Sequence, residues 1–287
     1  LAGEVAPEAD PLELVDEDPD RRIERFTARA IELSAEAIRS ALGRAGVGVQ
    51  DVSGIVVNTC TGYICPGIST YLIERLGLSR SIRAFDMVGS GCGGAIPNLQ
   101  AAASLVKPGC VVVSVSVEIC SATLQMDNDL SLILSNALFG DGAAAAVLWD
   151  RPSGWELIAS ATRYVPEQRE TIRYIHRRGQ LHNQLSLKLP DLVKKAAAEV
   201  VADVLKAQSL TVGSVKHWAL HTGGEKIINA VRDEIGIPED RLAATIAAQR
   251  GRPARVMLDG VLSVVETFAR GTAQADDITL VVIRRQD

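Results

Sequence analysis

The sequence lacks the features that mark membrane, disordered and nucleic-acid-binding proteins. No apolar run approaches the roughly 18 to 20 residues that cross a bilayer, and a hydrophobic content of 47% excludes an intrinsically disordered chain. Lys and Arg form no stripe and the formal net charge is -5, so nucleic acid and anionic lipid have no electrostatic basis as partners. A chain of 287 residues is long enough for one large domain or two smaller ones.

Signals for disulfides and secretion are also scarce. The five cysteines are an odd number in a chain that can fold without disulfides, so we predict reduced thiols and treat one of them as a candidate nucleophile. No basic segment followed by an apolar stretch and a small-residue cleavage site opens the sequence, and we therefore expect a cytoplasmic location. Residues 1–20 hold eight acidic residues, three prolines and no Lys or Arg, which predicts a weakly ordered, acidic lead-in.

Helices and strands are predicted to alternate through the first half of the chain, residues 21–150. Apolar residues at three- and four-residue steps indicate the helices, and short β-branched or apolar runs indicate the strands. Such alternation implies a sheet covered by helices. The predicted helices are 26–45, 69–76 and 95–106, and the predicted strands are 54–58, 82–88, 110–117 and 143–149.

A similar order follows in residues 151–245. Pro190 stands at a plausible first position of a long helix that continues to about residue 205. A strand is predicted over 215–220, then a turn, and then a helix over 225–235 that ends before a glycine. We therefore predict a layered α/β fold with two related halves.

Among the cysteines, Cys92 has the setting most favourable to a thiolate. It lies in the segment 89–95, GSGCGGA, between an apolar strand and a helix, where backbone N–H groups and the helix dipole favour negative charge. The glycines leave room for a substrate at the sulfur. The alternative is a small buried residue at a packed turn, and for Cys60, Cys110 and Cys120 we expect only such packing.

A nucleophilic thiol needs a base or cation as a partner, and the chain has four histidines. His221 is the best placed, because it ends an apolar run and precedes a Gly-Gly turn and a helix, at a strand end where functional groups of α/β sheets gather. The alternative for His221 is a structural histidine paired with the backbone. We expect His176 and His182 in a loop or on the surface, and His217 on the same strand as His221.

Five short motifs follow one another along roughly residues 21–245. They read CTGYICPG at 60–67, GCGGA at 91–95, VEIC at 117–120, ALFGDGAAA at 137–145 and HTGG at 221–224. In order and spacing they closely resemble type III polyketide synthases of the chalcone synthase family. The resemblance implies a thiolase fold in an α-β-α-β-α arrangement, with the nucleophile in the half 21–150 and the histidine in the half 151–245.

The resemblance also implies a function and a set of site residues. It implies a homodimer that condenses malonyl-CoA onto an acyl-CoA starter, with CoA thioesters as substrates, no cofactor and no metal. Cys92 would be the acylated nucleophile, His221 its base partner and a donor to the thioester carbonyl, and Phe139 the gatekeeper between the CoA tunnel and the cavity. Cys65 matches the position that crosses the dimer interface into the partner's cavity, and Thr123 matches a cavity-lining position.

One catalytic position departs from the family pattern. The family's third catalytic group is an asparagine, whose place is taken here by Ala254, and no asparagine follows Asn229. Because loss of one donor to a developing negative charge costs on the order of 10²–10³ in rate, we expect acyl transfer to Cys92 to survive better than condensation. The alternatives are a catalytically silent dimerising or acyl-binding protein and a ketoacyl-ACP synthase III-like enzyme that loads from an acyl carrier protein.

The tail, residues 246–287, resembles the final helix and strand of metal-dependent bacterial serine/threonine phosphatases of the stress- and sporulation-regulator type. In that family Asp276 would bind a divalent metal. A single carboxylate does not make a metal site, so we expect residues 278–283 to supply an edge or closing strand. A phosphatase fragment is the remaining alternative.

Overall fold

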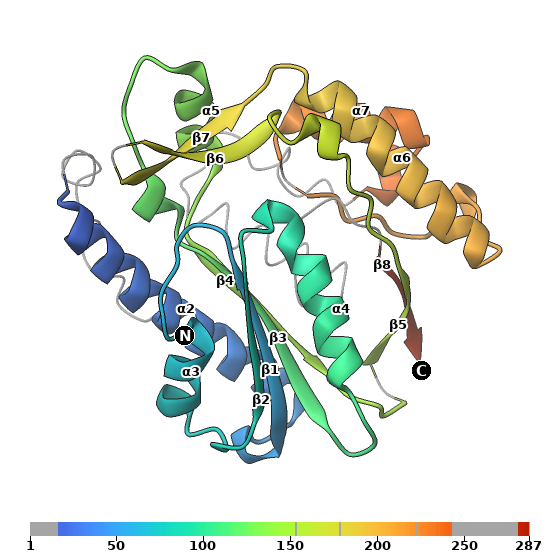
Figure 1. The fold of residues 1–287 in the computed structure, drawn as a ribbon. Helices are drawn as coiled ribbons and strands as arrows, with labels where there is room; N and C mark the ends of the chain where they lie inside the picture. Colours follow the sequence, from blue (N-terminus) through green and yellow to red (C-terminus); the bar gives the residue numbers. More distant parts are fainter. Residues whose placement is uncertain (1–16, 153, 178, 222, 243–280, 287) are drawn as a thin grey trace.

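A mixed four-stranded sheet lies at the centre of the computed structural model, which describes residues 17–152, 154–177, 179–221, 223–242 and 281–286. The strand order is β2-β1-β3-β4, with the first three strands parallel and the last antiparallel to its neighbour (Figure 1). The strands are β1 (Val52–Thr59), β2 (Arg83–Val88), β3 (Val111–Glu118) and β4 (Gly142–Leu148). All four predicted strands of the first half are therefore confirmed to within two residues.

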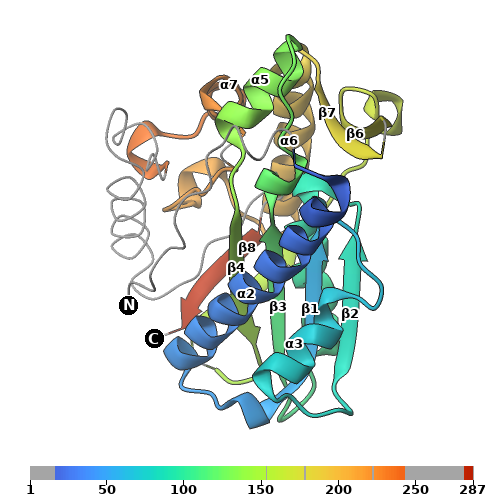
Figure 2. The same ribbon diagram turned by 90° about the vertical axis from the view of Figure 1, so that its left-hand side faces the viewer.

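Helices cover both faces of this sheet. Helices α2 (Pro19–Ala45) and α3 (Ile68–Leu76) pack on one face (Figure 2), and α4 (Ala95–Leu105) packs on the other (Figure 1). Alternate residues of a strand point to opposite faces. Val113 accordingly belongs to the core cluster beneath α2 and α3, while Val112 belongs to the cluster beneath α4.

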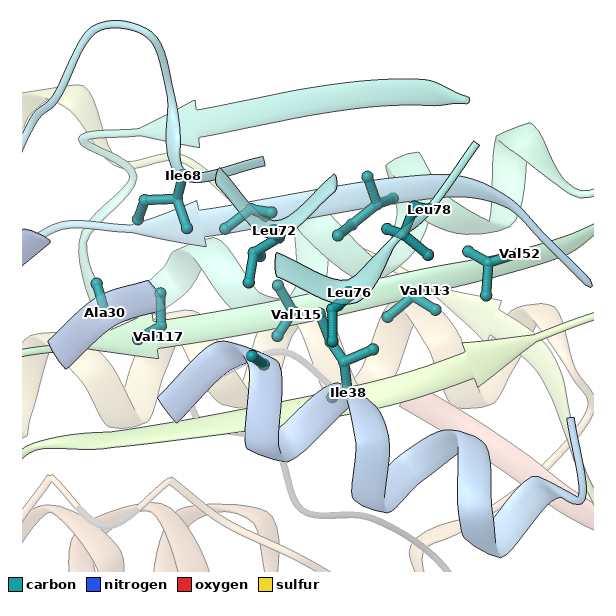
Figure 3. Packing of buried hydrophobic residues seen from close by; sticks show 14 of the residues in the cluster. Ala30, Ile38, Val52, Ile68, Leu72, Leu76, Leu78, Val113, Val115 and Val117 are labelled. Carbon is teal, nitrogen blue, oxygen red and sulfur yellow. The ribbon is translucent and has the colours of Figure 1, made fainter. Parts of the chain in front are cut away.

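The larger core cluster lies between the sheet and the pair of helices α2 and α3. Figure 3 shows Ile38 of α2 and Leu72 and Leu76 of α3 next to Val113 and Val115 of β3, in one cluster. Strands β1 and β3 are buried on both faces, which explains why each contains a run of three consecutive apolar residues, Ile55–Val57 and Val111–Val113. The apolar runs in the sequence thus identify the two central strands.

The start of α2 corrects the predicted acidic lead-in. The helix begins at Pro19, seven positions before the expected helix 26–45. Asp18 caps it, because its Oδ1 accepts a hydrogen bond from the backbone N of Asp20 at 2.9 Å, and proline suits a first helical position. Glu17 also forms an ion pair with Arg25 at 2.6 Å. The prediction of weak order is therefore wrong for residues 17–20, and residues 1–16 lie outside the described residues.

The remaining elements gather at the end of the sheet where β2 meets α4 (Figures 1 and 2). They include a hairpin, β6 with β7, that the sequence analysis did not predict; Gly179, with φ of 75°, lies between its strands. The elements are α5 (Leu130–Leu138), β6 (Ile172–Arg177), β7 (Gln180–Leu185), α6 (Leu189–Ala207) and α7 (Glu225–Ile235).

Two predictions for the second half have different outcomes. Strand β8 (Val281–Gln286) pairs antiparallel with β5 (Gly154–Ser160), so the expected closing strand is confirmed for residues 281–283. The strand expected over 215–220 is wrong. Its pairing is limited to a bridge between Trp218 and Leu242 among the described residues, and the apolar character of Trp218 serves packing against α6 instead.

None of the helices within the described ranges is long and apolar enough to cross a membrane. The same part of the chain holds no group of three His, Cys, Asp or Glu side chains that are placed to bind a metal ion. Asp276 lies outside the described residues.

Candidate active site

Cys92 lies where the sequence predicts it, in a tight turn between a strand and a helix. The turn η2 (Gly91–Gly94) leads from β2 directly into α4. Gly89 and Gly91 have φ values of 83° and 63°, a backbone conformation that residues with a side chain adopt only under strain. The glycines therefore allow the turn that places Cys92 beside the first turn of α4.

Buried asparagines fasten this turn and α4 to the sheet. Asn58 packs so closely beneath the turn that a Cβ on Gly94 would lie 2.8 Å from its amide nitrogen, and its Oδ1 accepts a hydrogen bond from Ser116 at 2.5 Å. The amide of Asn98 in α4 donates to Ser114 Oγ at 2.8 Å and also to two backbone carbonyl groups of β1 and β3. Because buried polar groups fix geometry when they are paired, the position of Cys92 is tied to the sheet.

A cavity of about 1610 Å³ opens beside the turn. Cys92, Phe139 and His221 all line it, although they lie far apart in the sequence. Phe139 caps the C-terminus of α5, and His221 precedes α7. A Cβ on Gly223 would come within 3.2 Å of the His221 ring, so this glycine leaves room for the imidazole. The fold thus brings three of the predicted site residues to one cavity.

The other two predicted site residues lie elsewhere. Thr123 lines a smaller pocket of about 270 Å³ rather than the main cavity, and its hydroxyl donates to the carbonyl oxygen of Cys120 at 2.9 Å. Phe139 and Asn183 line both spaces. Cys65 is exposed in the loop between β1 and α3 and lines neither space in the described structure.

The other three histidines differ in their position relative to the main cavity. His176 lies in β6 at the edge of the main cavity, rather than in a loop. His182 lies in β7, and His217 is exposed next to Trp218. Neither of these two lines the cavity. The structure therefore favours His221 over His182 and His217 as the partner of a cavity thiol.

A second thiol at the site contradicts the expectation that Cys60 only packs. Cys60 lines the cavity, and its thiol is hydrogen-bonded to Cys92. This hydrogen bond, together with burial and the nearby charge of Glu118, raises the pKa of Cys60 far above its usual range. Cys60 follows β1 and Cys92 follows β2, and these parallel neighbours end at the same edge of the sheet.

Glu118 and Tyr174 are further groups that the sequence analysis did not assign. Burial raises the pKa of Glu118, against the hydrogen bonds that it accepts. Burial likewise raises the pKa of Tyr174, a cavity-lining residue of β6 that is hydrogen-bonded to Thr123. Burial also raises the pKa of Cys120 to about 12. An acidic residue at the end of an apolar strand was the available signal for Glu118, whereas nothing in the sequence around Tyr174 indicated a cavity.

The fold is that of solved type III polyketide synthases, such as 1,3,6,8-tetrahydroxynaphthalene synthase from Streptomyces coelicolor A3(2), on which the chain superposes with a TM-score of 0.80 and 21% identity, over 94% of this chain and 82% of that one. The chain superposes on PKS-I from the brown alga Ectocarpus siliculosus with a TM-score of 0.82 and 26% identity, over 99% of this chain and 82% of that one. This likeness confirms the predicted thiolase-type α/β fold. The family of FAE1/type III polyketide synthase-like proteins matches residues 7–164, and the chain belongs to this family.

The chain is also similar in sequence to curated synthases of bacterial origin. The chain is 33% identical to a 3,5-dihydroxyphenylacetyl-CoA synthase of Streptomyces toyocaensis, over 82% of this chain and 64% of that protein. It is 28% identical to a 1,3,6,8-tetrahydroxynaphthalene synthase of Streptomyces peucetius subsp. caesius, over 83% of this chain and 65% of that protein. The chain thus spans slightly less than two thirds of the length of these relatives. The resemblance of residues 246–287 to phosphatases has no counterpart in these matches.

Proposed function

We propose that the chain acts as a type III polyketide synthase-like acyltransferase, in which a CoA thioester acylates Cys92 and malonyl-CoA extends the acyl group. The observation that supports this most directly is the meeting of Cys92 and His221 at one cavity of about 1610 Å³. Membership of the family supports the same chemistry. The reaction uses two CoA thioesters as substrates and requires no metal or other cofactor.

The proposed loading step is a thioester exchange. The Cys92 thiolate attacks the carbonyl carbon of the acyl-CoA, a new carbon–sulfur bond forms, and the bond to the CoA sulfur breaks. His221 accepts the thiol proton of Cys92 and returns it to the departing CoA sulfur. A thiolate beside the first turn of α4 is stabilised by the backbone N–H groups of that turn.

The lining of the cavity suits an acyl-CoA. Its walls include Leu134, Leu138 and Phe139 from the region of α5, and Val193 and Val200 from α6. Such a lining favours an apolar chain because apolar surface leaves water on binding. Several cationic side chains also line it and are suited to the phosphates of CoA, among them Arg169, Arg173 and Lys226. Arg169 and Arg173 both form ion pairs with Glu170.

Acylation of Cys92 tests the proposed function. We expect a medium- or long-chain acyl-CoA to add one acyl group per chain, located on Cys92 by peptide mass mapping, and we expect the Cys92→Ala variant to gain none. The matched control is Cys110→Ala, because Cys110 does not line the cavity. Absence of any adduct on the unmodified chain would contradict the proposal and favour a silent protein of this fold.

We further propose a homodimer that covers the free edge of the central sheet. Strand β2 lies at one end of the strand order, and two of its apolar side chains, Phe85 and Val88, are 53% and 46% exposed. Tyr63, in the loop that also contains Cys65, is 71% exposed. An exposed edge strand offers unpaired backbone groups to another chain, and exposed apolar patches of this kind mark interaction surfaces.

Light scattering measures the expected dimer. We expect twice the chain mass at tens of micromolar, and a shift to monomer for Phe85→Glu, because a charge on the covered edge would have to be buried. Ile158→Glu, on an exposed position of β5, is the control and should leave the dimer intact. A strict monomer for the unmodified chain would contradict the proposal.

A further inference from the structure

Glu118 is a partly buried carboxylate that accepts hydrogen bonds from residues at and just after the end of β1. It accepts hydrogen bonds from the backbone N of Cys60 at 2.9 Å and 3.0 Å, one to each oxygen. One oxygen also accepts from the backbone N of Thr61 at 3.0 Å, from its hydroxyl at 2.8 Å, and from the Thr59 hydroxyl at 3.3 Å. These donors favour the charged form of the carboxylate, although burial is the larger effect and raises the pKa of Glu118.

The Cys60 thiol lies between this carboxylate and Cys92. It is hydrogen-bonded to both groups, and both cysteines line the main cavity. Once Cys92 is a thiolate, the only thiol proton of this pair is that of Cys60. If Cys60 lost its proton, its thiolate would lie beside Glu118 and Cys92, and repulsion between like charges opposes this state.

We propose that Glu118 is a positioning residue which keeps Cys60 as a neutral thiol that donates to the sulfur of Cys92, so that the reactive thiolate forms on Cys92 and not on Cys60. The inference rests on the proposed role of Cys92 as the nucleophile. It adds a second cysteine and a carboxylate to the loading step, each acting through Cys92.

Other titratable groups surround the two sulfurs and belong to the same electrostatic environment. They come from four parts of the chain around the cavity. The Cys60 thiol differs from them because it is hydrogen-bonded to Cys92. Two interacting thiols also titrate as a pair, so the experiment has to report on each sulfur separately. The groups are Glu118 at the end of β3, Cys120 in η3 (Cys120–Thr123), Tyr174 in β6 and His221 before α7.

The pH dependence of alkylation tests whether the Cys60 thiol donates a hydrogen bond to the sulfur of Cys92. Iodoacetamide is added at a series of pH values, and peptide mass mapping gives separate rates for Cys92 and Cys60. For Cys60→Ala we expect Cys92 alkylation at pH 7 to be about tenfold slower, which corresponds to a rise of about one unit in its titration midpoint. Cys60→Ser keeps a donor and should restore the profile. Cys110→Ala, at a cysteine that does not line the cavity, is the control for the loss of a thiol and should leave the profile unchanged.

Glu118→Gln tests the carboxylate. Without the negative charge, we expect Cys60 to become reactive, with at least a tenfold rise in its labelling relative to Cys92. Unchanged Cys92 alkylation in Cys60→Ala would overturn the inference, as would an unchanged labelling ratio in a folded Glu118→Gln variant. If Glu118→Gln fails to fold, the comparison of Cys60→Ala with Cys60→Ser decides. The assay contains no CoA thioester, so its failure is distinguishable from failure of the proposed function.

Discussion

Incubation with a long-chain acyl-CoA and malonyl-CoA is expected to leave most chains acylated on Cys92, while extended products form slower than the acyl-enzyme by on the order of 10²–10³. Loading needs a thiolate and a base, and Cys92 and His221 both line the cavity. Extension requires more, because loss of carbon dioxide from malonyl-CoA places enolate charge on the thioester oxygen. In the matched family an asparagine helps to stabilise that charge, and at the position where the resemblance places it, about 33 residues after His221, this sequence has Ala254.

Two products are followed in the same reaction. Intact-mass spectrometry reports the acyl group on Cys92, and labelled malonyl-CoA reports the extended products. The Cys92→Ala variant is the control for both signals. Extension as fast as loading would show the prediction to be wrong and would mean that another group supplies the missing donor. Acyl-enzyme without extension is the expected outcome.

Replacement of His221 by alanine is expected to slow acylation of Cys92 by about 10²–10⁴, the range typical of a general acid–base group. His221 lines the same cavity as Cys92, and Gly223 leaves space for its ring. Without the imidazole, the thiol proton has no base to accept it and the CoA sulfur leaves without a proton donor. The rate of acyl-enzyme formation, followed by quenched-flow mass spectrometry, measures the effect.

The matched control is His176→Ala. His176 is an exposed residue of β6 that also lines the cavity, so the variant removes an imidazole from the same space without removing the proposed base. We expect its acylation rate to stay within about threefold of the unmodified chain, since surface substitutions rarely disturb a structure. Equal losses in both variants would argue against a special role for His221. Loss in His176→Ala alone would assign that role to His176.

Local sequence patterns predicted the first half of the fold well. Strands β1 and β3 are buried on both faces, and burial of that kind leaves a continuous apolar run that can be read directly. Gly89 and Gly91 have the positive φ values that glycine adopts without strain, so the turn at Cys92 was also predictable. The strand expected over 215–220 failed, because an apolar segment can be buried by a helix as well as by a sheet.

The sequence likewise indicated some residues of the candidate site and missed others. The order of motifs indicated Cys92, His221 and Phe139, and all three line one cavity. The sequence did not indicate that Cys60 contacts Cys92 or that Tyr174 enters the same space. Both depend on segments that are distant in the chain and meet only when the sheet and the hairpin are assembled.

The sequence by itself determined the family motifs, the two central strands, the glycine turn at Cys92 and the absence of an asparagine after Asn229. These are properties of single segments, and hydrophobic burial and backbone sterics act within a segment. The tertiary structure decided which side chains share a cavity and how Glu118 and Cys60 lie beside Cys92. Parallel pairing of β1 with β2 and β3 brings three strand ends to one edge of the sheet. This pairing joins distant segments and cannot be recognised from the sequence of any one strand.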